Sequence, residues 1–411
     1  MALIVPFKAI RPSKEEAATI AALPYDVYNR QEAYEKVKEQ PGSFLAIDRP
    51  ETQFAPDVDM YSDDVYNKAA QMLNQWIEEG RFIQDDEDFF YLYELTMDGR
   101  LQTGIVACAS IDDYEKSVIK KHENTRAEKE QDRIRHVDTC SAQTGPIFLA
   151  YKSDSTINGV VEKTKSRKPV YDFVAEDGIR HRCWVIDKMM DKALITTAFD
   201  KMNSIYIADG HHRAASAVKV GLKRRAENPG YTGREDFNFF LSVLFPDEEL
   251  KIYDYNRVVK DLNGFAPEEL LEELDSIVDI LETADSPIRP SKKGQWSMLL
   301  EGTWYLCQVK PELLVDDPVE GLDVSLLQNL VLEPLLGIED PKTDARIDFV
   351  GGIRGLEELE RRCATDCKVA FAMYPTSIEE LFAVADAGLL MPPKSTWFEP
   401  KLRSGLFIHR I

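Results

Sequence analysis

The spacing of apolar residues along the 411-residue chain changes repeatedly between the period of a strand and that of a helix. Apolar residues recur every third or fourth position in several segments, which predicts amphipathic helices at 31–40, 61–79, 266–275, 323–336 and 377–388. Strand-like runs flank turn residues at three places, which predicts β-hairpins around Asp98-Gly99, Asp177-Gly178 and Glu301-Gly302. Helices and hairpins interspersed in this way predict a mixed α+β fold.

Two polar segments rich in turn residues interrupt this pattern. The segment 153–169 predicts a long loop, and the segment 283–295 predicts a domain boundary. A chain of this length exceeds one ordinary domain. We therefore expect an N-terminal and central α+β region at 1–285 and an additional α+β C-terminal domain at 286–411.

One strand-to-helix junction concentrates polar chemistry. In "SIYIADGHHRAASAVKVGL" the isoleucines alternate as in a strand, and the alanines that follow repeat at helical spacing. The first amides of the predicted helix lack intrahelical acceptors and lie at the positive end of its dipole, so they favour an anion. Gly210 lets a ligand approach the backbone. The next three residues, His211, His212 and Arg213, have side chains that can donate hydrogen bonds, and the planar guanidinium of Arg213 is suited to phosphate. We therefore predict a phosphate site here.

Asp209 precedes this cluster and repels a phosphate unless a Mg²⁺ ion lies between them. We therefore expect Asp209 to ligate Mg²⁺. An alternative interpretation makes Asp209 a helix N-cap and Gly210 a turn residue, with both histidines on the surface. That alternative leaves the run of histidines and arginine unexplained. Zinc is disfavoured because adjacent histidines on a helix point in different directions.

The net charge of −22 limits the class of partner. An acidic field repels the backbone of a nucleic acid, which makes nucleic acid an unfavoured partner, whereas a small nucleotide is held by local donors. The sequence has no apolar run long enough to cross a membrane and no basic region before its first apolar residues. The six scattered cysteines are typical of reduced thiols. We expect a cytoplasmic location. The sequence is compatible with either a monomer or a homo-oligomer.

Further candidate residues lie in polar stretches after strand-like segments. Glu123 in "KKHENTRAEKEQDR" and Asp26 in "PYDVY" are suited to accept a hydroxyl proton; the alternatives are a solvated helix start and a turn cap. Arg49 in "IDRPE" can reach a substrate carboxylate, or form an exposed pair at a rim. Lys394 and Ser395 in "MPPKSTWFEPK" lie in a rigid polar loop, which is either a second phosphate or substrate contact or plain surface.

Several of these stretches resemble known families. "YIADGHHRAASA" resembles the phosphate-binding motif of the ParB and sulfiredoxin-like superfamily, and its opening Asp-Gly-His is similar to that of the free serine kinases in that superfamily. Over nearly its whole length the chain also resembles a widespread prokaryotic domain-of-unknown-function family, sometimes labelled chromosome-partitioning regulators. The matching stretches are "LPYDVYNRQEA", "PGSFLAIDRPE", "HENTRAEKEQDR", "GPIFLAY", "IADGHHR" and "MPPKSTWFEPK".

The resemblance implies a ParB/sulfiredoxin-like nucleotide-binding core and a Mg²⁺-dependent kinase. Such an enzyme would transfer a phosphoryl group from ATP or ADP to a small hydroxyl-bearing substrate, here free L-serine, to give O-phosphoserine. From the residues and the resemblance together we predict catalysis by Glu123, Asp209 and Asp26, phosphate binding by Gly210, His211, His212 and Arg213, and substrate binding by Arg49, His122, Lys394 and Ser395.

The alternative is a ParB-like nucleotide-dependent DNA-binding or regulatory module. Its local support is the basic cluster Lys223-Arg224-Arg225. The acidic total and the lack of a clear helix-turn-helix with a basic recognition helix argue against it.

Overall fold

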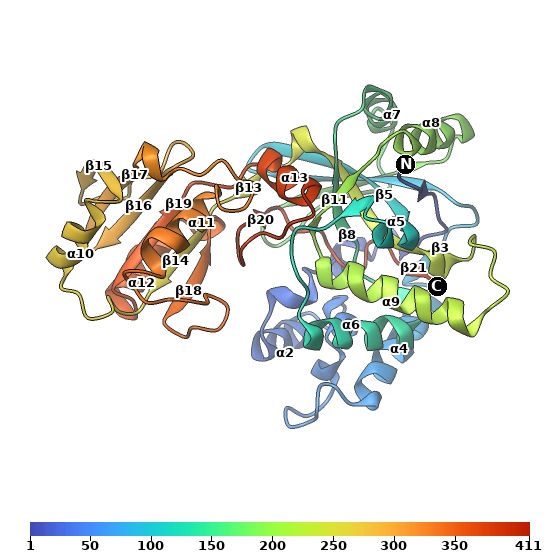
Figure 1. The fold of residues 1–411 in the computed structure, drawn as a ribbon. Coiled ribbons are helices and arrows are strands. Elements are labelled where there is room, and N and C mark those ends of the chain that lie inside the picture. The colour runs from blue at the N-terminus through green and yellow to red at the C-terminus, as the bar shows by residue number, and fades with distance from the viewer. The chain divides into compact units, whose positions relative to one another are not determined.

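The computed structural model describes residues 1–411, which form two compact units (Figure 1). Unit 1 comprises 1–250 together with 400–411, and unit 2 comprises 251–399. Helices and strands are interspersed in both units, which confirms the predicted mixed α+β fold. None of the helices has both the length and the hydropathy that a membrane span requires.

Unit 1 is built on a nine-stranded sheet of mixed direction. Its order is β6-β11-β8-β12-β5-β4-β10-β9, with β1 paired to β5. The strands are β1 (Ile4–Val5), β4 (Phe90–Met97), β5 (Arg100–Ser110), β6 (Ile119–Lys120), β8 (Ile147–Tyr151), β9 (Tyr171–Val174), β10 (Arg180–Ile186), β11 (Ile205–Asp209) and β12 (Phe239–Pro246). The predicted hairpins at Asp98-Gly99 and Asp177-Gly178 are confirmed as β4–β5 and β9–β10, because the turns place Asp98, Gly99 and Gly178 at positive φ.

Nine helices belong to unit 1. They are α1 (Ala17–Ile20), α2 (Arg30–Glu39), α3 (Leu45–Asp48), α4 (Asp63–Glu78), α5 (Ile111–Glu115), α6 (Ala127–Cys140), α7 (Ser155–Lys165), α8 (Met189–Asp200) and α9 (His211–Glu227). Helices α2 and α4 confirm the predictions at 31–40 and 61–79. The predicted loop at 153–169 is wrong, because the Asp154 carboxylate accepts the amides of Thr156 and Ile157 and so caps α7.

The apolar core of unit 1 fixes the helix that carries the His-His-Arg run. Ala214, Ala217 and Val218 of α9 are buried in the same cluster as Ile205 and Ile207 of β11. On its other side α9 packs along α6, which in turn contacts α4 (Figure 1). The start of α9 is therefore held between the sheet and a helical layer.

Unit 2 contains a six-stranded antiparallel sheet in the order β15-β17-β16-β19-β14-β18. Its strands are β14 (Tyr255–Val259), β15 (Val278–Ala284), β16 (Gln295–Leu300), β17 (Thr303–Val309), β18 (Ile347–Gly351) and β19 (Val369–Met373), and its helices are α10 (Pro267–Leu274), α11 (Asp323–Leu327), α12 (Glu357–Thr365) and α13 (Ile378–Asp386). The predicted hairpin at Glu301-Gly302 and the helices at 266–275 and 377–388 are confirmed. The segment 323–336 is α-helical only through Leu327 and continues as a π-helix, Gln328–Leu332.

The division between the units differs from the predicted boundary between 285 and 286. The polar segment 283–295 connects β15 to β16 inside unit 2, and both of these strands pair with β17. Strand β14, which sequence order assigns to the preceding region, lies inside the unit 2 sheet between β19 and β18. The chain therefore leaves unit 1 after Leu250 and returns to it at Pro400.

Three two-stranded ladders complete the structure. They are β2 (Ile10–Pro12) with β3 (Phe82–Gln84), β7 (Ala142–Gln143) with β21 (His409–Arg410), and β13 (Ile252–Tyr253) with β20 (Trp397–Phe398). Isolated bridges also join Ala22 to Ser404 and Ile10 to Ile408. The segment 400–411 is thus an integral part of unit 1.

Candidate functional site

The junction between β11 and α9 has the geometry of an open helix start. Strand β11 ends at Asp209 and α9 begins at His211, with Gly210 between them at a φ of 95°. A Cβ on Gly210 would lie 3.0–3.1 Å from the guanidinium of Arg213, which folds back over this turn. No side chain caps the helix, so Asp209 is not the N-cap of the alternative interpretation. The amides of the first turn are left without a side-chain acceptor.

Asp209 is held as a carboxylate by neighbouring cations. Its Oδ2 accepts a hydrogen bond from Lys401 Nζ at 3.0 Å. Partial burial raises the pKa of Asp209, but the charges of Lys401 and Arg213 outweigh it and hold that pKa below its usual value. No cluster of three or more metal-binding side chains is present. A single carboxylate fits Mg²⁺ held jointly with ligand phosphates and does not fit a cage made by the protein alone.

His211 and His122 form a buried pair behind the turn. Their rings meet edge to face at 4.6 Å, and His211 Nε2 accepts the His122 amide at 3.5 Å. The Nδ1 of His211 lies 3.8 Å from Glu123 Oε2. Burial lowers the pKa of both imidazoles, that of His122 to about 4, so both are neutral at pH 7. The Nδ1 atom of His122 is enclosed and has no hydrogen-bond partner.

His212 and Arg213 are less enclosed than His211. The Arg126 amide donates to His212 Nε2 at 2.9 Å, so the neutral ring carries its proton on Nδ1. Burial lowers the pKa of His212 against the opposing charge of Asp26. Arg213 donates one N–H to the carbonyl oxygen of Pro146. This bond engages one of the five guanidinium N–H groups.

A polar cavity of about 230 Å³ is lined by residues of the segments 25–30, 49–66 and 129–133, and not by the junction itself. Its charged lining residues are Asp26, Arg30, Arg49, Glu51, Lys129, Asp132 and Arg133. A smaller cavity of about 30 Å³ is lined by Arg213. Both cavities share Tyr25 and Arg133 as walls. The structure therefore brings together the predicted residues Asp26, Arg49 and Arg213 in one region of unit 1.

Arg49 supports the turn that carries Asp26. Its Nε donates to Glu51 Oε1 at 2.6 Å, and its Nη1 donates to the carbonyl oxygens of Tyr25 and Tyr28 at 3.0 and 2.8 Å. Arg49 and Glu51 are both buried, so they are not the exposed rim pair of the alternative interpretation. Most of the guanidinium is committed to positioning the 3₁₀ turn Tyr25–Val27.

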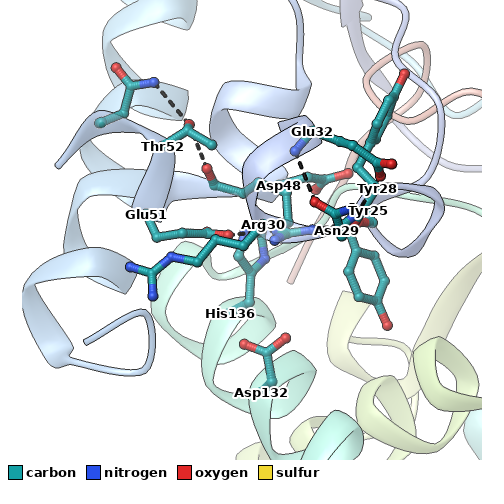
Figure 2. Close-up of polar contacts among 12 residues, drawn as sticks. Tyr25, Tyr28, Asn29, Arg30, Glu32, Asp48, Glu51, Thr52, Asp132 and His136 are labelled. Atoms are coloured by element: carbon teal, nitrogen blue, oxygen red, sulfur yellow. Dashed lines mark hydrogen bonds and ion pairs between the residues drawn. The ribbon is translucent and has the colours of Figure 1, made fainter. Parts of the chain in front are cut away.

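Asp132 and Arg133, which lie in the stretch "KKHENTRAEKEQDR" but for which the sequence predicts no specific role, shape this cavity. Asp132 accepts hydrogen bonds from Tyr66 at 2.8 Å and from Arg133, whose guanidinium lies 4.0 Å from the ring centroid of Tyr25. Figure 2 shows Asp132 on α6, on the side that faces the segment with Tyr25. Lys401 was noted only as part of a loop. Its contact with Asp209 joins residues 192 positions apart, a relationship that no sequence spacing reveals.

Lys394 and Ser395 belong to unit 2, so the geometry of unit 1 does not test their predicted role. Ser395 is buried, and its Oγ donates to the Pro392 carbonyl oxygen at 2.7 Å. The side chain of Lys394 is exposed. Ser395 therefore uses its hydroxyl within its own loop.

The basic cluster at the end of α9 is neutralised by carboxylates. Lys223 and Arg224 both pair with Asp138, and Arg225 donates to Asp112 at 2.6 Å. These pairs offset the positive charge of the cluster.

Comparison with solved structures gives low similarity. A mutant of free serine kinase in complex with ADP has a TM-score of 0.35 at 14% identity, over 75% of this chain and 93% of that chain. SbnI with C-terminal truncation from Staphylococcus aureus has a TM-score of 0.36 at 12% identity, over 73% and 85%. A conserved hypothetical protein from Pyrococcus furiosus has a TM-score of 0.32 at 15% identity, over 74% and 94%.

A search of the curated proteins finds no match. The family model described as "Protein of unknown function (DUF1015)" matches residues 4–325, which is most of the chain. This match confirms the predicted relationship to a domain-of-unknown-function family, and the chain belongs to the DUF1015 family.

Proposed function

We propose that unit 1 binds the phosphates of ATP or ADP at the start of α9 and transfers a phosphoryl group to a small hydroxyl compound. Free L-serine is the acceptor that the sequence resemblance implies. The observation that carries the proposal is an uncapped helix start, overlain by Arg213, together with a charged cavity lined by Asp26, whose charge acts on His212. Amides at a helix start, an arginine fork and a nearby carboxylate are the parts that phosphoryl transfer needs.

The phosphate-binding role is shared between backbone and side chains. The first amides of α9 point away from the helix and are available to phosphate oxygens. Arg213 supplies the fixed positive charge, and His212 can donate from Nδ1 while it is neutral. The buried His211 packs behind the turn and keeps its backbone in place. A Mg²⁺ ion held by Asp209 and the phosphates would neutralise the charge that builds up between them.

Two carboxylates are candidates to accept the proton of the attacking hydroxyl. Asp26 lines the cavity that would receive the acceptor, on a turn fixed by Arg49. Glu123 lies close to Nδ1 of His211, at the other side of the junction. Either carboxylate would be able to orient a hydroxyl and accept its proton.

The test incubates the purified protein with Mg²⁺, ATP or ADP, and a panel of amino acids and small alcohols, with product detection by mass spectrometry. We expect a phosphorylated product with serine. Asp26→Asn and Glu123→Gln separate the two bases, because loss of the true base lowers turnover by about a hundredfold or more and leaves nucleotide affinity almost unchanged. Equal turnover in both variants would remove both carboxylates from the mechanism.

Nucleotide binding is tested separately by calorimetry. Arg213→Ala should weaken nucleotide affinity by about tenfold or more, because it removes a charge-assisted donor. Arg225→Gln is the matched control, since Arg225 lies at the far end of the same helix and pairs with Asp112. An unchanged affinity in Arg213→Ala would contradict the phosphate site.

A further inference from the structure

Unit 2 contains a buried arginine that has no acidic partner. Arg257 of β14 is 3% exposed and makes no ion pair. Its Nη1 donates to the carbonyl oxygen of Tyr255, a neutral acceptor. Burial lowers the pKa of Arg257 to about 10, so the side chain is still a cation at pH 7. A buried charge without a counter-charge is costly to maintain in a folded protein.

The acidic residues closest in sequence lie on the other face of the sheet. Successive side chains of a strand point to opposite faces, so Asp254 and Asn256 project away from Arg257. Asp254 accepts from Asn256 at 2.7 Å and lies 3.9 Å from Arg289. Asp348 is opposite Val258, also on that other face. Arg257 therefore lacks an acidic partner because the strand register places these carboxylates on the other face of the sheet, and a different side-chain rotamer would not change this.

An aromatic ring lies against the cation instead. The guanidinium carbon of Arg257 lies 5.4 Å from the ring centroid of Phe349, its cross-strand neighbour. Tyr255 meets the rings of Phe349 and Trp397 edge to face at 6.1 and 5.1 Å. Lys394 adds a second cation, with its Nζ 5.4 Å from the Tyr255 centroid. We call Tyr255, Phe349 and Trp397 the aromatic cluster of unit 2.

The aromatic cluster is rigidly supported. The Trp397 ring packs on Gly351, where a Cβ would come within 3.0 Å of it. Trp397 is also the first residue of β20, which pairs with β13, and it lies opposite Tyr253 in that pair. Arg257 contacts the Phe349 ring and Lys394 contacts the Tyr255 ring, so both cations flank the same set of rings. Such an arrangement suits a flat or apolar group joined to an anion.

We propose that Arg257 and Lys394 bind the oxyanion of a small molecule whose flat or apolar body packs on the aromatic cluster of unit 2. The oxyanion of the ligand supplies the negative charge that Arg257 lacks within the protein. A phosphate and a carboxylate share the planar or forked oxygen geometry that an arginine recognises. Phe349, Lys394 and Trp397 lie beyond residues 4–325, and the site belongs wholly to unit 2, so it does not depend on the function proposed for unit 1.

The test titrates the full chain with phenyl phosphate and with benzoate in a calorimeter, and follows the melting temperature in parallel. We expect at least one of the two probes to bind and to raise the melting temperature. The two probes distinguish a phosphate from a carboxylate as the natural anion. Failure of both probes to bind would overturn the proposal.

Variants locate the binding. Arg257→Gln should weaken the affinity by about tenfold or more, because the charge-assisted bonds are lost, and Lys394→Ala should weaken it less. Arg361→Gln is the matched control in unit 2, since Arg361 is exposed and pairs with Glu358. Arg213→Ala should leave probe binding unchanged, which separates this site from the nucleotide site of unit 1.

Folding of the key variant is checked without a probe. Arg257 has no acidic partner, so its replacement leaves no buried carboxylate without a counter-charge. Arg257→Gln should therefore melt at the wild-type temperature or above. Loss of probe binding in a variant that melts normally supports the site. Wild-type affinity in Arg257→Gln would overturn it.

Discussion

At the scale of single residues, the histidines share one property. All six lie in unit 1, at positions 122, 136, 181, 211, 212 and 409. Burial is the first cause that lowers the pKa of each one. The folded protein therefore keeps these imidazoles neutral at a pH where the unfolded chain protonates them.

This property predicts that unit 1 loses stability on mild acidification. The unfolded chain binds more protons than the folded chain below pH 6.5, so the free energy of unfolding falls as the pH falls through that value. For His122, a shift from 6.5 to about 4 corresponds to about 3 kcal/mol, lost progressively between those two pH values. Urea unfolding at a series of pH values measures the slope. His122→Gln should flatten it, and an identical slope in that variant would contradict the assignment.

At the scale of elements, local chemistry determined which predictions succeeded. The Asp-Gly and Glu-Gly hairpins could be predicted because the turn itself demands positive φ at those residues. Helix α7 was missed because its polar exposed residues resemble a loop, while Ile157, Val160 and Val161 supply a narrow buried face. The strand-to-helix junction at Asp209–His211 was predictable because both periodicities are local.

Asp323, the first residue of α11, gives unit 2 a pH dependence of stability opposite to that of the histidines in unit 1. Asp323 is buried, and burial raises its pKa to about 7, although its Oδ1 accepts the Gly294 amide at 2.9 Å. A raised carboxyl pKa contributes stability that is complete below pH 3.8 and is lost as the pH rises through 7. Asp323→Asn keeps the acceptor and removes the titration.

We therefore expect Asp323→Asn to stabilise unit 2 above pH 7 by up to about 4 kcal/mol, with much less effect at pH 5. Hydrogen exchange read by mass spectrometry reports residues 251–399 separately from the rest. An equal effect at both pH values would show that Asp323 is ionised throughout this range. Mild acid thus weakens unit 1, whereas a rise in pH weakens unit 2.

At the scale of the whole molecule, the main contacts join distant parts of the chain. The fold class and the position of the nucleotide-site candidate could be predicted, because they rest on local patterns. The insertion of unit 2 could not, because it depends on β14 pairing with β18 and β19 about a hundred residues later. The Asp209–Lys401 contact escaped prediction for the same reason.

Removal of residues 400–411 should destabilise unit 1 strongly. This segment buries Leu402, Leu406, Phe407 and Ile408, and at about 1.5–3 kcal/mol for each side chain its loss costs at least about 6 kcal/mol. That amount is comparable to the total stability of an ordinary domain. Thermal melting and nucleotide binding of the truncated protein measure the effect. Lys401→Met is the control, because it removes the Asp209 contact and leaves the apolar residues in place.

The return of residues 400–411 to unit 1 has a consequence for biosynthesis. As the chain emerges from the ribosome, all of unit 2 is available before β21 reaches its partner β7. Unit 2 can fold first, whereas unit 1 lacks the β7–β21 pairing until β21 has been synthesised. Lys401 therefore reaches Asp209 only after residues 251–399 have been synthesised, so the candidate phosphate-binding turn acquires this cation late.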